Sequence, residues 1–284
     1  MAQQRESYGQ GVEPIAPILS LKKRSQGHFF QQLHGLDFTQ DFTRDLMRDL
    51  TGNLTLSAIP LRLRVEAQGL GYYSAIALKL SAQGQVPLEK VFSILSQSLT
   101  VPPCLPNGKS SQVLTALPGH GLGWLWDYGQ MAEWLRALIP VLGALPGSFT
   151  PTITAPVPWG FVQYAQGRCG AMGRLLPRLE DPPVIREEPL LLPDPLRSLF
   201  KTLVNALDDW ETRPSVTLTN LALTLSQAIL TFEAQAWPYR SPNTASALVS
   251  WQSLLLENCQ TVLGIWLAQA GMTTEQEGAR MGLF

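Results

Sequence analysis

The apolar residues of this chain follow different periods in two successive regions. Between residues 37 and 143, stretches with helical spacing alternate with stretches in which apolar and polar residues take turns. After residue 194, apolar residues recur every three or four positions. Alternation is typical of half-buried strands, and the longer spacing is typical of amphipathic helices. The pattern predicts an α+β protein in which a small N-terminal α+β domain precedes an all-α helical bundle.

The region from 37 to 143 is predicted to contain both kinds of element. A strand is expected before residue 65, where apolar residues alternate with Arg62 and Arg64. Two further strands are expected at 113–117 and 122–126, joined by the glycine-rich sequence PGHG. Helical spacing predicts helices at 38–50, 73–80, 87–99 and 131–142.

The chain after residue 143 is predicted to be a linker followed by helices. Residues 144–158 are rich in proline, which fits neither a helix interior nor a central strand. Residues 159–284 are expected to form the helical domain, interrupted by a second proline-rich stretch at 177–193. Three apolar stripes predict three long helices that pack as a bundle, at 196–207, 218–232 and 248–266.

The first 36 residues carry no comparable pattern. They are polar, contain several Gly and Gln, and include the basic triplet Lys22-Lys23-Arg24. We expect a mobile leader over residues 1–36, with a short docking arm as the alternative interpretation.

Composition narrows the class of protein. Only 15% of residues are charged and the formal net charge is -1, so the chain lacks the basic excess common in nucleic-acid-binding proteins. Residues 194–284 carry five basic and eight acidic residues, a net charge of -3. The three cysteines are far apart, and no Cys/His spacing is typical of a metal site. We expect no metal, no cofactor, no signal sequence, no membrane span and a cytoplasmic location.

Four blocks of sequence resemble class I arginyl-tRNA synthetases, in the order of that family. FVQYAQGR at 161–168 is similar to the family's YVQYAHAR segment, at the border of the anticodon-binding domain. GYYSAIALKLS at 71–81 and LPGHGLGWLWDYGQMAEWLRAL at 117–138 resemble parts of the family's additional N-terminal domain. Residues 196–272 resemble its DALR-type anticodon-binding bundle. The resemblance therefore implies an N-terminal tRNA-contacting domain followed by a DALR-type domain.

The catalytic part of the family has no counterpart here. The sequence contains neither a HIGH-like nor a KMSK-like motif, and only about 20 residues precede FVQYAQGR where a nucleotide-binding domain would stand, too few for one βαβ unit. The resemblance therefore implies a catalytically inactive protein, a tRNA-binding accessory or regulatory module. One alternative is a protein–protein interaction or assembly factor without RNA binding. A disfavoured alternative is part of an arginine-tRNA ligase whose catalytic domain another chain supplies.

Candidate site residues follow from the resemblance and from the pattern. Residues expected to contact tRNA or a partner are Arg62, Arg64, Arg168, Trp237, Tyr239 and Arg240. Residues expected to make structural hydrogen bonds at the domain junction are Gln163, Tyr164 and Gln166. The Lys-poor composition, rich in Gln, Leu and Pro, favours a bacterial source. A contiguous basic face spanning both domains would favour tRNA, whereas an apolar, uncharged patch larger than a few hundred Å² would favour a protein partner.

Overall fold

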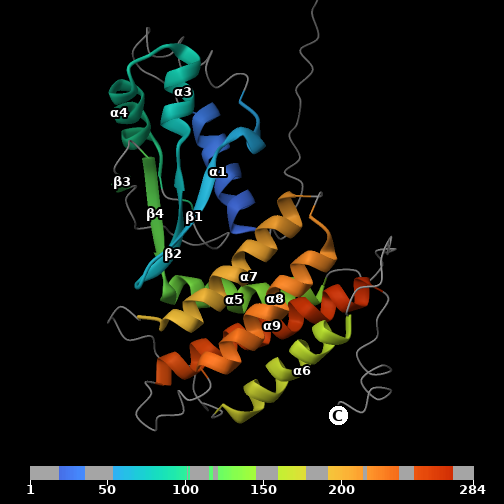
Figure 1. Ribbon diagram of the computed structural model, residues 1–284. Coiled ribbons are helices and arrows are strands. Elements are labelled where there is room, and N and C mark those ends of the chain that lie inside the picture. The colour runs from blue at the N-terminus through green and yellow to red at the C-terminus, as the bar shows by residue number, and fades with distance from the viewer. Residues whose placement is uncertain are drawn as a thin grey trace, which may run out of the picture.

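The computed structural model describes residues 19–35, 54–100, 102, 115–117, 121–144, 159–176, 191–213, 216–236 and 246–270. In these residues a four-stranded antiparallel sheet stands on a layer of long helices (Figure 1). The predicted fold class, α+β, is confirmed at this coarse level. The predicted helix at 38–50, most of the linker at 144–158 and most of the stretch at 177–193 lie outside the described residues.

The sheet has one strongly apolar face. Its strand order is β1-β2-β4-β3. In the antiparallel register of β2 and β4, Tyr72 stands opposite Trp124, and Trp126 follows on the same face two residues later. All three side chains are 1% exposed. The strands are β1 (Leu61–Val65), β2 (Gly69–Ser74), β3 (Thr115–Leu117) and β4 (Gly121–Asp127).

The sequence predicts β1, β3 and β4 but not β2. Tyr73, assigned above to a helix, lies in β2. Gly69 and Gly71 interrupt the apolar alternation that would indicate a strand. Both positions require glycine because the β2 backbone lies very close to β4. A Cβ on Gly69 would lie 2.3 Å from the backbone oxygen of Trp126, and a Cβ on Gly71 would lie 1.9 Å from that of Trp124.

A helix, α1 (Leu21–Gly35), occupies part of the predicted leader. Leu21, Phe29 and Leu33 share one face of α1 and are 1–2% exposed. The Phe29 ring packs edge-on against Trp124, with ring centroids 4.9 Å apart. The prediction of a mobile leader is therefore wrong for residues 21–35. Three buried apolar side chains are enough to hold α1 against the sheet, and they are too few to form the long apolar stripe by which a helix is recognised in a sequence.

The remaining small helices lie at the end of the sheet that points away from the long helices (Figure 1). A short 3-10 turn at Leu56–Ala58 precedes β1. Helix α3 spans Ile76–Gly84 and α4 spans Leu88–Ser98, where Pro87 takes the N-cap position. These two helices agree with the predicted spacing, except that α3 begins after Tyr73 rather than at it.

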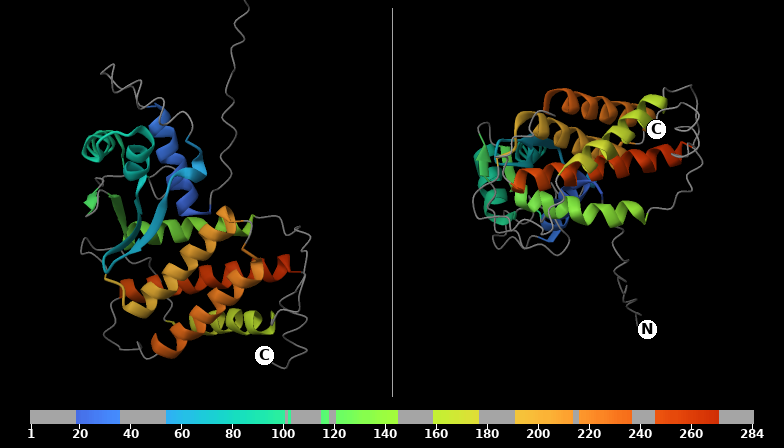
Figure 2. Two further views of the ribbon diagram at one scale, coloured as in Figure 1. Left: turned by 45° about the horizontal axis from the view of Figure 1, so that its top comes forward. Right: turned by 90° about the horizontal axis from the view of Figure 1, so that it is seen from below.

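Long helices form the second layer (Figure 2). A capping box starts α5: the Asp127 carboxylate accepts from the backbone N–H of Gln130 at 2.8 Å, and the Gln130 side chain accepts from the Asp127 N–H at 3.2 Å. The bounds are α5 (Tyr128–Gly143), α6 (Trp159–Leu175), α7 (Asp194–Thr212), α8 (Leu218–Ala236) and α9 (Ser246–Gln269).

Helix α5 belongs to the helical layer as much as to the sheet. It runs beside α9, and the Trp251 indole donates to the backbone oxygen of Tyr128 at 2.7 Å (Figure 2). The Phe200 ring packs edge-on against Trp251 at 4.9 Å, so α5, α7 and α9 share one core. The predicted domain boundary at residue 143 would therefore assign α5 and α9 to different domains, although the two helices pack against each other.

Helices α6 and α9 approach each other closely over two glycines. A Cβ on Gly264 of α9 would lie 2.8 Å from the Gln166 side chain of α6. A Cβ on Gly170 of α6 would lie 2.9 Å from the Gln260 side chain of α9. Since the order of these pairs reverses between the helices, α6 and α9 run antiparallel.

Candidate functional site

The junction between the sheet and the helical layer is built around one buried carboxylate, Asp208 of α7. Its Oδ1 accepts from the Ser20 hydroxyl at 2.8 Å and from the Lys22 backbone N–H at 3.1 Å. Its Oδ2 accepts from the Tyr72 hydroxyl at 2.5 Å. Asp208 is 3% exposed. One side chain thus connects α7, β2 and the start of α1.

A second carboxylate of α7 reinforces the start of α1. Glu211 accepts from the backbone N–H of Ser20 at 2.6 Å and pairs with the Lys23 ammonium at 3.0 Å. The Ser20 hydroxyl in turn accepts from the Lys23 N–H at 2.9 Å, as an N-cap residue does. Carboxylates are favourable here because the first turn of a helix presents unpaired N–H groups and a positive dipole end.

Burial decides the protonation behaviour of Asp208. Removal from water raises its pKa to about 6, although the hydrogen bonds from Tyr72, Lys22 and Ser20 and the charge of Lys22 act in the opposite direction. Burial, followed by the Asp208 charge, raises the pKa of Tyr72 well above its usual value. Asp208 is therefore mostly ionised at neutral pH, within reach of a proton under mildly acidic conditions.

A cavity of about 310 Å³ opens beside this network, between α1, β1 and α7. Four cations and two carboxylates line it together with Asn205 and three apolar or aromatic side chains. The lining residues are Lys22, Leu61, Arg62, Leu63, Tyr72, Lys201, Asn205, Asp208, Asp209 and Arg213.

The charges of this junction cavity are unbalanced. Asp209 pairs with Arg213 at 3.2 Å, one turn further along α7. Lys22, Arg62 and Lys201 form no salt bridge with any residue that the structure describes. With both aspartates ionised the cavity keeps two positive charges in excess. Such a site suits an anion of phosphate size, which could accept hydrogen bonds from several of these donors.

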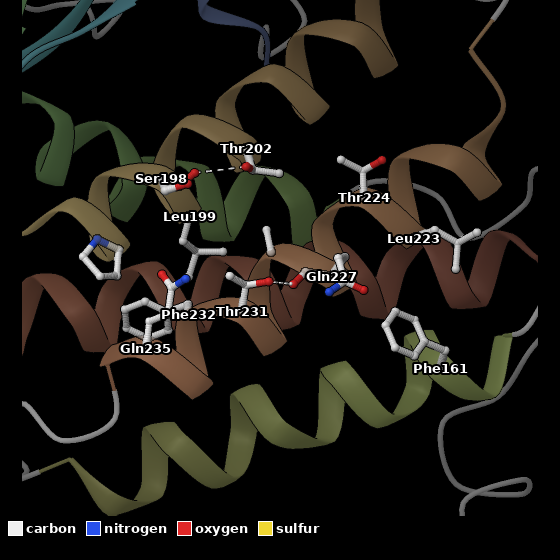
Figure 3. A pocket seen from close by; sticks show the side chains of 12 residues that line it. Phe161, Ser198, Leu199, Thr202, Leu223, Thr224, Gln227, Thr231, Phe232 and Gln235 are labelled. Carbon is white, nitrogen blue, oxygen red and sulfur yellow. Dashed lines mark hydrogen bonds between the residues drawn. The ribbon is translucent and has the colours of Figure 1, made fainter.

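A larger cavity of about 560 Å³ lies between α7 and α8, with Phe161 of α6 at one side (Figure 3). Its lining carries no charged residue. Two threonine hydroxyls donate within their own helices, Thr202 to the Ser198 backbone oxygen at 3.0 Å and Thr231 to that of Gln227 at 2.8 Å. The α7–α8 groove is therefore a neutral surface of hydroxyl, amide and apolar groups.

The structure separates the arginines predicted to contact tRNA or a partner. Arg62 is exposed and lines the junction cavity. Arg64, on the same strand, pairs with Glu66. Arg168 of α6 pairs with Glu233 of α8, with Nε donating at 2.9 and 3.1 Å. The Arg168 guanidinium is thus already engaged in a salt bridge with Glu233.

The three residues predicted at the domain junction lie instead within the helical layer, on α6. Gln163 is 6% exposed, and the Gln166 amide reaches the Gln260 backbone oxygen of α9 at 3.5 Å. Tyr164 is 44% exposed. The predicted Trp237, Tyr239 and Arg240 lie outside the described residues.

Sequence reasoning missed the central residues of the junction. In the sequence, Lys22 stands out only as part of a basic triplet in an expected leader. Lys201 and Asp208 lie on α7 seven residues apart, two helical turns, but the net charge of -3 for residues 194–284 concealed a local basic cluster. A search for polar residues at i, i+4 and i+7 beside the apolar stripe of α7 would have found them.

The described residues contain neither a metal-site candidate nor a candidate membrane span. No group of three or more His, Cys, Asp or Glu side chains among them is arranged to hold a metal ion. Within the same residues, no helix combines the length and apolar character needed to cross a bilayer. Comparison with protein-family models, curated proteins and solved structures finds no match for this chain.

Proposed function

We propose that this protein is a catalytically inactive, arginyl-tRNA synthetase-like module that binds tRNA through the junction cavity. The observation that carries the proposal is the set of three cations without a salt-bridge partner among the described residues, Lys22, Arg62 and Lys201, around one cavity. They come from α1, β1 and α7, so the cluster spans the sheet and the helical layer.

The cluster is distinctive because the rest of the chain is so sparsely charged. With a net charge of -1, the protein has no general attraction for polyanions. A local excess of positive charge in a concave site is then a specific place for a backbone phosphate. A phosphate there would contact the N-terminal sheet and the helical layer at once, as a tRNA lying across both would require.

The order of elements supports the synthetase-like part of the proposal. In the described residues after 158, four long helices occupy the stretch whose sequence resembles a DALR-type domain. The sheet and its small helices precede them, in the stretch that resembles the additional N-terminal domain. The lack of HIGH-like and KMSK-like motifs is the reason for proposing no catalysis.

A salt titration of tRNA binding tests this function. We expect binding clearly tighter than the generic range of about 10⁻⁴–10⁻⁶ M at physiological salt, with affinity falling as salt rises. Binding within that generic range would contradict the proposal. ATP–pyrophosphate exchange in the presence of arginine should be undetectable, and measurable exchange would contradict the catalytically inactive assignment.

A protein partner is the second candidate, because the α7–α8 groove is uncharged and about 560 Å³ in volume. The substitution Gln227→Glu would place a negative charge in this groove. It should leave the affinity for tRNA unchanged if tRNA binds at the junction cavity. Loss of tRNA binding in Gln227→Glu, with Arg62→Ala unaffected, would place the RNA at the groove instead.

A further inference from the structure

Asp208 belongs both to the network that holds α1 and to the wall of the junction cavity. Its ionised carboxylate offsets part of the positive charge of that cavity. A phosphate group bound there would bring a second negative charge close to the first. Two anions in one partly buried site repel each other, and a proton on one of them relieves the repulsion.

The hydrogen-bond network has a place for this proton. Oδ1 of Asp208 accepts two hydrogen bonds, one of them from a backbone N–H that cannot act as an acceptor. Among the described residues, Oδ2 accepts only from the Tyr72 hydroxyl, which can turn and become the acceptor when Oδ2 carries a proton. Protonation at Oδ2 therefore keeps every contact of the network.

Within the part of the chain that the structure describes, the charged and titratable groups around Asp208 do not include a histidine, the side chain that ordinarily titrates near pH 6. Burial and the Asp208 charge raise the pKa of Tyr72 far above this range. The groups that share the junction cavity with Asp208 are Lys22 of α1, Arg62 of β1, Tyr72 of β2, and Lys201, Asp209 and Arg213 of α7. Lys23 and Glu211 pair with each other and contact Ser20, which donates to Asp208.

We propose that the junction cavity binds a phosphate group together with one proton, which Asp208 carries on Oδ2. The proposal rests on the proposed RNA-binding function of the same cavity. Burial has already raised the pKa of Asp208 to about 6. A bound phosphate raises it further, and by thermodynamic reciprocity the proton then strengthens phosphate binding to the same extent.

The test is the affinity of a uridine oligonucleotide without terminal phosphates, measured from about pH 5 to about pH 8 at constant ionic strength. Its phosphodiesters keep their charge throughout, so only the protein titrates. We expect the affinity to rise roughly threefold to tenfold as the pH falls across this range, since a shift of about one pKa unit corresponds to tenfold. In Asp208→Asn the affinity should be independent of pH and close to the low-pH value of the unaltered protein.

Calorimetry of the unaltered protein provides a readout that does not depend on the stability of that variant. Binding near neutral pH, repeated in buffers of different ionisation enthalpy, should show uptake of a fraction of one proton. A variant with all histidines replaced, His28→Gln with His34→Gln and His120→Gln, should take up the same fraction.

Two failures are distinguishable. Oligonucleotide binding without proton uptake, or uptake lost in the histidine variant and retained in Asp208→Asn, would overturn the proton coupling and leave the RNA-binding function standing. Absence of binding by both tRNA and the oligonucleotide at every pH would overturn the proposed function and the coupling together.

Discussion

The junction between the sheet and the helical layer and the contact between α6 and α9 hold helices against their neighbours by different means. At the junction, a buried carboxylate is surrounded by three hydrogen-bond donors. Between α6 and α9, glycines allow a close approach, and the amides of Gln166 and Gln260 lie over them. The first contact depends on specific partners and on pH, whereas the second depends on shape. The chemically responsive contact in this protein is therefore the one that polar groups, rather than packing, hold together.

Removal of the central carboxylate should have the largest effect. Asp208→Ala leaves the Tyr72 hydroxyl, the Ser20 hydroxyl and the Lys22 N–H without their acceptor in a buried site. We expect a loss of about 3–4 kcal/mol in the free energy of unfolding, measured by urea denaturation at neutral pH.

The neighbouring residue provides a matched control for that variant. Asp209 is partly exposed and pairs with Arg213 on the same helix, so Asp209→Ala should cost about 0.5 kcal/mol. Equal losses in the two variants would remove the special role of Asp208.

The pH dependence of stability should be the next largest effect. The folded pKa of Asp208, about 6, lies above its ordinary value of 3.8, so the folded chain keeps a proton that the unfolded chain has lost in between. Stability from this group is therefore fully present below about pH 4 and is lost as the pH rises through about 6. Between these limits the unaltered protein should lose about 2–3 kcal/mol relative to Asp208→Asn. Parallel pH profiles for the two proteins would contradict this assignment.

The glycine contact should respond weakly to a small side chain. In Gly264→Ala the new Cβ meets only the end of the flexible Gln166 side chain, which can move. Alanine also favours a helix by about 1 kcal/mol over glycine, so we expect a change in stability within about 0.5 kcal/mol. A loss above about 2 kcal/mol in thermal denaturation would mean that the Gln166 amide is fixed.

The smallest effect is expected at the ion pair between α6 and α8. Arg168 and Glu233 are both partly exposed to water, with side chains 41% and 18% accessible. A double-mutant cycle of Arg168→Ala and Glu233→Ala should give a coupling of about 0.5 kcal/mol that falls with added salt. A coupling that salt does not change would argue against a water-screened pair.

Periodicity predicted the parts of this fold whose signal is local. The stripes of α7, α8 and α9 and the burial of Trp124, Trp126, Trp251 and Trp266 follow from spacing alone. Helix α1 and strand β2 were missed because tertiary contacts determine them: α1 depends on Phe29 against the sheet, and β2 depends on Gly71 beneath Trp124.

The candidate site was predictable only in part, because it is assembled from distant segments. Arg62 was selected from the polar positions of its strand, but its neighbours Lys22 and Lys201 are separated from it by about 40 and 140 residues of sequence. For Arg168, the spacing of charges along the chain does not reveal that the fold pairs it with Glu233, 65 residues away. Composition gives the sum of charges, while binding depends on where the fold gathers them.

The slope of tRNA affinity against salt, compared between variants, tests the central claim most directly. Each phosphate contact contributes about 0.7–0.9 to the slope of log affinity against log salt concentration. Arg62→Ala combined with Lys201→Ala should therefore flatten the slope by about 1.5 and weaken binding, while Arg168→Ala should change neither. An unchanged slope in the double variant, or an equal change in Arg168→Ala, would contradict tRNA binding at the junction cavity.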